Sequence, residues 1–273
     1  MKSKEKALIA VLSAFLFNCS QDRIVELPLT MHNGYGPFSM GFRGVSPISQ
    51  NVNNLWSKTY PTISKFPSDL TELKYGFIET NIYQLVYQNY LLGDITKDRY
   101  EYLQKSWNWV PDTINLSMIP VKTQIAFIFG KDSEGEIKVA IDANNNLDLS
   151  DDILFAPLFE TSSFWNHSNK DSLAQIHAVD VSFETYVHSK ISLASAPLFI
   201  IKDNSPYSFM CNFSQYATTQ FKGVQRVVCS NNFLELSYKE IEVAIINQEL
   251  ETGFQETKNT KLFIESPQDG RTS

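Results

Sequence analysis

The sequence predicts a mainly β fold, either an antiparallel sandwich or a strongly bent sheet, with one α-helical hairpin near residues 80–107. Two observations lead to this prediction. From about residue 118 onward, apolar and polar residues alternate along many short segments separated by polar turns, which is typical of antiparallel strands with one buried face. The clear helical spacing of apolar residues lies between residues 80 and 107.

Residues 1–18 have the features of a secretory signal peptide. Lys2, Lys4 and Lys6 form a basic start, and the apolar core that follows is too short to span a bilayer. The core runs from Ala7 to Phe17 and is followed by Asn18 and Cys19, an arrangement that resembles the signal of bacterial lipoproteins. That resemblance implies acylation of Cys19 and a location at the outer membrane of the bacterial cell envelope. The alternative is an ordinary cleaved signal in which Cys19 has no special role.

Removal of the signal takes away three lysines and one glutamate from a chain whose formal net charge is −7. The mature chain then carries a net charge of about −9, which argues against a nucleic-acid partner. Its length fits one large β domain or two smaller ones.

Residues 19–70 are rich in proline, glycine, serine and asparagine, which predicts an extended lead segment rising from the lipid anchor. Their aromatic content is too high for free disorder, so part of the segment should pack on the body. We expect residues 71–117 to form the helical hairpin against the body, and residues 118–273 to form the β-rich domain.

In the hairpin, Thr80 is the expected N-cap and Gly93 the expected stop of the first helix, and the second helix begins near Thr96. Trp107 and Trp109, at its end, are candidates for a sugar-stacking platform, although aromatic residues in such positions usually belong to the core. The expected strands are 121–129, 136–142, 174–187, 190–201, 206–214, 216–222, 224–230, 233–246 and 259–265.

The most informative stretch is the acidic loop at residues 142–152. Oxygen-bearing side chains stand at alternate positions, as in loops that wrap a calcium ion. The candidate ligands are Asp142, Asn144, Asn146 and Asp148, with Asp151 or Asp152 closing the shell. Leu147 replaces the usual glycine and Ile153 the usual closing glutamate, which argues against a true EF-hand. The alternative is an Asn/Asp-rich surface turn, and we expect any bound ion to be structural.

Cys211 and Cys229 are the cysteines that remain after Cys19, and they lie on expected strands that are candidate neighbours. An even pair in an exported chain predicts a disulfide; two buried thiols are the alternative. The four histidines have no metal-ligand spacing, and we expect His177 to lie partly buried on a strand. No catalytic residue is predicted.

The acidic loop after a hairpin, together with Gln215–Gly223 leading into Ser230–Phe233, resembles the β-rich N-terminal region of exported bacterial lipoproteins that carry a thioredoxin-like (TlpA-like) reductase domain farther on. The resemblance covers roughly residues 120–247. The Cys-x-x-Cys motif of that domain does not occur here, so the resemblance implies no redox activity for these residues.

Three functions are compatible with these patterns. The favoured one is a non-enzymatic, lipid-anchored envelope protein with a structural calcium loop, which binds a protein or small ligand. The second is the accessory region of a thiol-disulfide oxidoreductase whose catalytic domain lies beyond residue 273. The third is an envelope hydrolase or glycan-binding protein, which predicts carboxylates or tryptophans along an open cleft.

Overall fold

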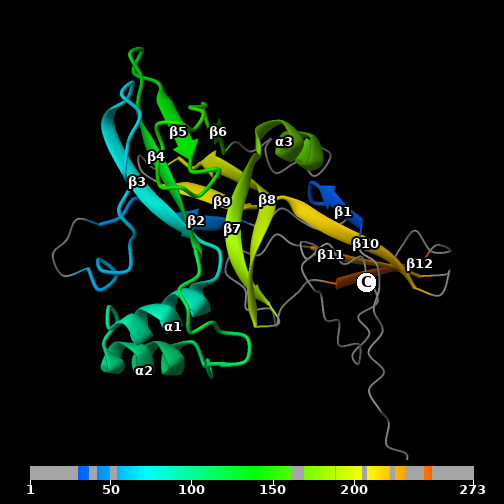
Figure 1. Cartoon of the computed structure of the whole chain (residues 1–273). Helices are drawn as coiled ribbons and strands as arrows, with labels where there is room; N and C mark the ends of the chain where they lie inside the picture. Colours follow the sequence, from blue (N-terminus) through cyan, green and yellow to red (C-terminus); the bar gives the residue numbers. More distant parts are fainter. Residues whose placement is uncertain are drawn as a thin grey trace, which may run out of the picture.

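The computed structural model describes residues 30–36, 42–49, 54–160, 169–187, 189–204, 208–221, 225–230 and 243–247. It confirms the mainly β fold with a helical hairpin (Figure 1). Within these residues, no helix is long and apolar enough to cross a membrane.

The strands form three sheets. The three-stranded sheet has the antiparallel order β3 (Thr71–Glu79), β4 (Gln124–Lys131) and β5 (Ile137–Ile141). The five-stranded sheet has the order β2 (Arg43–Val45), β9 (Phe209–Phe213), β8 (Lys190–Lys202) and β6 (Leu158–Phe159), with β7 (Val179–Val187) also paired to β8. The four-stranded sheet has the order β1 (Thr30–Asn33), β10 (Gln215–Phe221), β11 (Gln225–Ser230) and β12 (Val243–Asn247).

The three-stranded and five-stranded sheets pack face to face, which gives the sandwich its core. Alternate side chains of β4 and β5 meet alternate side chains of β7, β8 and β9, as a period of two requires. The largest members of this core are Ile78, Ile125, Phe127, Phe129, Ile141, Phe183, Leu198, Ile200, Phe209 and Phe213. Two of these rings, Phe129 and Phe209, lie 4.8 Å apart across the interface between the sheets.

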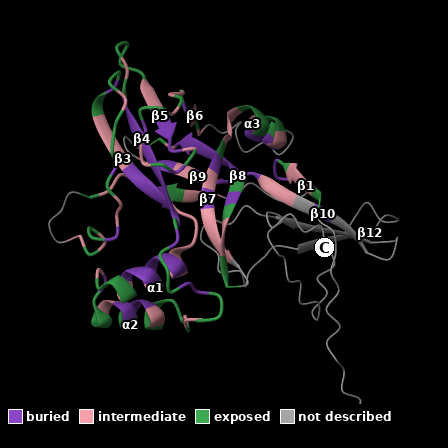
Figure 2. Ribbon diagram, viewed as in Figure 1, coloured by how far each residue is buried: buried purple, intermediate pink, exposed green. Residues whose placement is uncertain are grey.

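The other face of the three-stranded sheet is also covered. Ala126 and Ile128 of β4 are fully buried there, beneath residues of the lead segment and the acidic loop. This second core contains Ile63, Leu70, Phe77, Ala126, Ile128, Ala140 and Leu149. Strand β4 is therefore buried on both faces, and it runs through the molecule as a continuous buried strand in Figure 2.

The helical hairpin consists of α1 (Ile82–Leu92) and α2 (Lys97–Ser106). Asn81, rather than the expected Thr80, caps α1 by accepting a hydrogen bond from the N–H of Gln84. Gly93 ends α1 with a φ of 83°, and Thr96 caps α2, both as expected. The Asn81 side chain reaches the first free N–H groups from one position closer to the helix, which explains the shift in the cap.

Three expectations for the elements are wrong. Residues 71–79, grouped above with the helical hairpin, form β3, which pairs with β4 at Thr71 and continuously from Lys74 to Glu79. Residues 174–177, expected to begin a strand, belong to α3 (Lys170–His177). His177 therefore ends a helix, half-buried, and does not share a strand face with Val179. The expected strand 259–265 and most of 233–246 lie outside the described residues.

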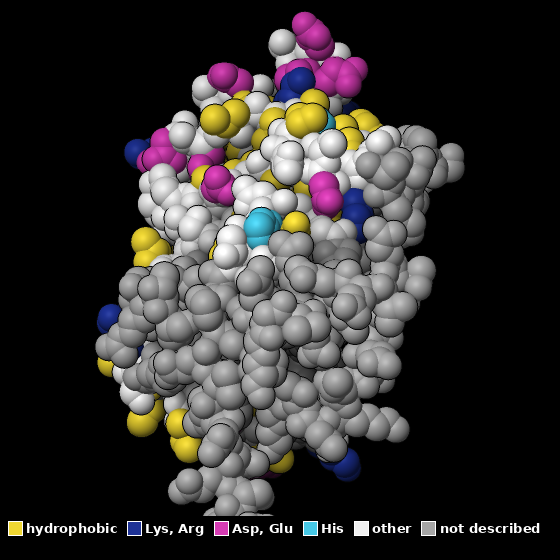
Figure 3. Space-filling view, turned by 90° about the vertical axis from the view of Figure 1, so that its right-hand side faces the viewer, with side chains coloured by type: hydrophobic (Ala, Val, Ile, Leu, Met, Phe, Trp, Pro, Cys, Tyr) yellow, Lys and Arg dark blue, Asp and Glu magenta, His cyan; other side chains and the backbone are white. Residues whose placement is uncertain are grey.

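Figure 3 views the side of the molecule on which β10, β11 and β12 lie. Asp and Glu side chains stand at several separate places on the described part of this face, interleaved with apolar side chains and a few lysines or arginines. This is the mixed surface of a solvated protein face.

The turn between β4 and β5 provides a test of this hairpin. Asp132 accepts hydrogen bonds from the N–H groups of Glu136 and Glu134, at 2.9 Å each, and these bonds and Lys138 lower its pKa. A lowered folded-state pKa stabilises the fold at neutral pH, and this contribution is lost as the pH falls through the acidic range. We expect Asp132→Asn to reduce the acid-induced loss of stability in urea melts. An unchanged pH profile would show that this turn does not titrate with folding.

Candidate metal-binding loop

The acidic loop begins where the buried hairpin ends. Asp142 follows β5 directly, and its N–H continues the sheet by donating to the carbonyl of Ala126 at 2.9 Å. The chain returns at Phe155, whose N–H and carbonyl both pair with Val139 at 2.9 Å. Both ends of the loop are thus fixed to the same sheet, which limits how far the carboxylates can separate.

The loop curls around the carboxylate of Asp142, which is fully buried. Its Oδ1 accepts from the N–H of Asn146 at 2.9 Å, and its Oδ2 from the N–H of Leu147 at 2.8 Å. Asn144 and Asn146 each accept from the N–H two residues farther on, at 3.0 and 2.7 Å. These successive Asx turns give the curled backbone that brings alternate side chains to one side.

Leu147 occupies the position where calcium loops of the EF-hand type have glycine. Its φ is 63°, so the backbone has the left-handed conformation that glycine normally supplies. Leu147 packs against the second core, beside the fully buried Leu149. The apolar contact therefore stabilises a conformation that a leucine rarely adopts, and the missing glycine does not prevent the curl.

A lysine from a distant part of the chain forms an ion pair with the loop. Lys65 of the lead segment places its Nζ 2.6 Å from Oδ2 of Asp148. Its carbonyl accepts from the N–H of Leu149 at 3.1 Å, and Ser64 donates its N–H to the carbonyl of Leu147 at 2.7 Å. The lead segment thus runs alongside the loop in a short parallel pairing.

The two closing carboxylates have different surroundings. Asp151 is exposed, and its Oδ2 accepts from the side-chain amides of Asn146 at 3.0 Å and Asn144 at 3.4 Å. Asp152 is half-buried, and its Oδ1 accepts from the N–H of Ala143 at 3.0 Å. Its Oδ2 is buried without a hydrogen-bond partner among the described residues. A buried carboxylate oxygen in this state is unfavourable unless something neutralises it.

The pKa values follow from these surroundings. Burial raises the pKa of Asp142, and burial followed by repulsion from nearby carboxylates raises the pKa of Asp152 to about 6. The hydrogen bond from Lys65 lowers the pKa of Asp148. One carboxylate of the loop therefore has a cationic partner, whereas two others are held where ionisation is disfavoured.

The structure brings all six predicted ligands into this one loop. As the loop stands, several of their oxygens accept N–H bonds from the loop itself. Across the part of the chain that the structure describes, no group of three or more His, Cys, Asp or Glu side chains is arranged so that it could hold a metal ion. The arrangement can nevertheless supply carboxylate, amide and backbone oxygens, which are the hard ligands that calcium takes.

The other predicted sites are less defined. Cys19 lies outside the described residues. Cys211 is buried on β9 in the sandwich core, whereas Cys229 lies on β11, of whose side chains nothing is described. The strand order places β9 and β11 in different sheets, not beside each other as expected, because the chain crosses into the four-stranded sheet at Ser214. The disulfide stays a prediction.

Among the histidines, His32 stacks on Tyr216 with ring centroids 5.0 Å apart, and its Nε2 lies 2.9 Å from Oγ1 of Thr218. These contacts fix β1 against β10. His167 and His188 lie outside the described residues. The chain matches no protein-family model, no curated protein and no solved structure.

The loop geometry predicts unequal effects of two substitutions. Asp142→Ala removes the side-chain acceptor of the Leu147 N–H and one of the two acceptors of the Asn146 N–H, which also donates to Asn144. An N–H group left unpaired away from water costs about 1–3 kcal/mol. We therefore expect a loss of about 1–3 kcal/mol in the free energy of unfolding, in the presence of a chelator as well as with calcium. Lys65→Ala breaks an exposed ion pair and should change the urea midpoint little.

The matched control is Asp142→Asn, which keeps one carbonyl acceptor and should fall between the wild type and Asp142→Ala. If Asp142→Ala is as stable as Lys65→Ala, the buried carboxylate does not support the loop.

Proposed function

We propose that this chain is a non-enzymatic, lipid-anchored β protein of the bacterial cell envelope whose acidic loop binds calcium as a structural ion. The observation that carries the calcium proposal is the buried Oδ2 of Asp152, which has no hydrogen-bond partner among the described residues; burial and then the nearby carboxylates raise the pKa of this side chain. A divalent cation would neutralise this repulsion and supply the missing partner.

Two further observations support calcium in particular. The ligand types are carboxylate and amide oxygens, which suit calcium or magnesium better than zinc or copper. The backbone at Leu147 has the left-handed φ that the sixth position of a calcium loop requires. Because the loop covers the second core through Leu149, a bound ion would stabilise the fold directly.

The envelope address rests on the sequence of residues 1–20, which lie outside the described residues. A lipid anchor would place the β body at a membrane surface, where a protein or small ligand is the expected partner. The accessory role in a thiol-disulfide oxidoreductase remains the alternative proposal.

The calcium proposal predicts effects of opposite sign for Asp152→Asn. With excess chelator, the variant should be more stable than the wild type, because it removes a poorly solvated negative charge. With calcium at one hundred times its dissociation constant, the wild type should gain about 2.7 kcal/mol and melt several degrees higher. The variant should lose most of that gain. The measurement is thermal unfolding of the full chain by circular dichroism.

The control is Glu134→Gln, which removes one exposed carboxylate from the turn at the other end of the same hairpin. It should respond to calcium as the wild type does. If calcium shifts neither protein relative to chelator, the loop is a polar turn and the calcium proposal is wrong.

The lipid anchor predicts that Cys19→Ala abolishes incorporation of labelled palmitate and releases the chain from the membrane fraction of expressing bacteria. Cys211→Ala, which alters a buried cysteine of the sandwich core, should keep the label. Retention of the label by Cys19→Ala would show that Cys19 is not the acylated residue.

A further inference from the structure

Two hollows lie side by side where the lead segment crosses β3 and approaches α1. The first, of about 330 Å³, is lined by Tyr60, Phe66 and Tyr75 among others. The second, of about 420 Å³, is lined by Trp56, Tyr60, Tyr83 and Trp107 among others. Both volumes are in the range of ligand sites. They meet at Tyr60, which lines both, and we call them together the aromatic groove.

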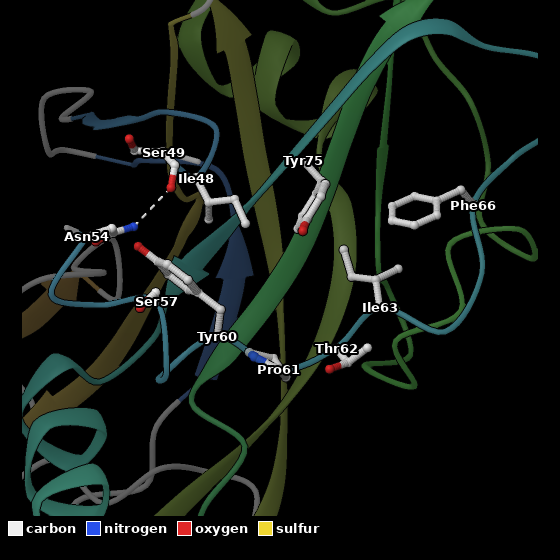
Figure 4. A pocket seen from close by; sticks show the side chains of 10 residues that line it. All are labelled: Ile48, Ser49, Asn54, Ser57, Tyr60, Pro61, Thr62, Ile63, Phe66 and Tyr75. Atoms are coloured by element: carbon white, nitrogen blue, oxygen red, sulfur yellow. Dashed lines mark hydrogen bonds between the residues drawn. The ribbon is translucent and has the colours of Figure 1, made fainter. Parts of the chain in front are cut away.

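Six aromatic side chains thus follow one another along the groove. Figure 4 shows the first hollow, with Tyr75 between Tyr60 and Phe66 and with Ile48 beside it. The ring centroids of Phe66 and Tyr75 are 5.6 Å apart. At the other end, Tyr83 meets Trp107 edge to face at 5.9 Å. Trp107 and Phe66 keep 36% and 39% of their surfaces exposed, so both ends of the groove offer ring surface to solvent.

An ion pair lies in the second hollow. Arg43 of β2 places Nη2 2.5 Å from Oε2 of Glu79, and its Nη1 donates to the Glu79 carbonyl at 3.3 Å. Both side chains are more than three-quarters buried. A ligand in the second hollow would therefore meet the N–H donors of Arg43 and the carboxylate acceptors of Glu79, and the opposite charges of these two side chains offset each other.

This combination selects the class of ligand. Because the charges of Arg43 and Glu79 offset each other, the pair gives neither an anion nor a cation a net electrostatic attraction in this hollow. A neutral sugar has hydroxyl groups that both donate and accept, and its ring has C–H faces that pack on aromatic side chains. A row of rings through two hollows fits several sugar units better than one.

We propose that the aromatic groove binds a neutral oligosaccharide, with Trp107 and Phe66 stacking on sugar rings at its two ends and the Arg43–Glu79 pair hydrogen-bonding to hydroxyl groups between them. Trp109, the other expected member of a tryptophan platform, does not line either hollow; its ring is tilted by 41° from that of Trp107 and packs against Tyr83 and Tyr100. The platform is therefore built from Trp107 and from residues far away in the sequence.

The test is calorimetric titration of the full chain with cellotriose and chitotriose, and with glucose and N-acetylglucosamine as single-unit probes. The lipid-anchored full chain needs a detergent, and this should be a polyoxyethylene ether. Glucoside and maltoside detergents carry sugar rings that would compete with the probes. We expect at least one trisaccharide to bind at millimolar concentration or below, and more tightly than its monosaccharide, because it reaches both hollows.

Two variants locate the site. Trp107→Ala should weaken trisaccharide binding about tenfold or more, the loss of one good stacking contact. Phe66→Ala, at the other end, should weaken the trisaccharide and leave any monosaccharide binding in the second hollow unchanged. Using both ends keeps the test valid if one variant misfolds, which circular dichroism would detect.

The control is Tyr102→Ala, which removes a 58%-exposed aromatic ring of α2 that lines neither hollow. It should bind like the wild type. The proposal is overturned if none of the four probes shows saturable binding, or if binding occurs but neither groove variant weakens it. Because the acidic loop is not involved, either result is independent of the calcium proposal.

Discussion

The burial of β4 on both faces is the constraint on which the rest of the fold depends. A strand of this kind needs apolar cover on each side, because Phe127 points to one layer and Ile128 to the other. The five-stranded sheet covers the first side. Among the described residues, the second side is covered by the lead segment together with Leu149 of the acidic loop, and not by another sheet. The loop is therefore part of the core structure as well as a candidate ion site.

This double role explains why the loop accepts an unfavourable arrangement of charge. Leu149 can reach the core only if the chain curls tightly after β5, and the curl requires Asp142 to bind N–H groups within a fully buried site. The same curl brings Asp151 and Asp152 back over Asp142. Carboxylate repulsion is thus a consequence of covering β4, and a bound cation is the simplest way to relieve it.

The sequence predicts those parts of the structure that depend on a few neighbouring residues. The alternation in β4 and β5, the Gly93 helix stop and the Asx-rich curl are each written in a few adjacent residues. Pairings between distant parts of the chain leave no such local signal. Strand β3 alternates at Leu73, Tyr75 and Phe77, but because it lies just before α1, its residues are predicted to belong with the helices. Likewise, no short window of sequence shows that Lys65 pairs with Asp148, eighty-three positions away, or which oxygen of Asp152 is buried.

The same reasoning accounts for the aromatic groove. Between β2 and β3 the lead segment contains Pro61 and Pro67, and it covers that face of β3 with single large side chains such as Tyr60 and Phe66. Irregular cover of this kind leaves hollows between rings, whereas a packed sheet would fill them. Strand β3 ends at Glu79 and α1 begins at Ile82, three residues later. This places the Arg43–Glu79 ion pair and Tyr83 in the second hollow of the aromatic groove. Coverage of one sheet face by the lead segment thus produces both the contact that closes the acidic loop, at Lys65, and the aromatic surface on which a sugar can stack.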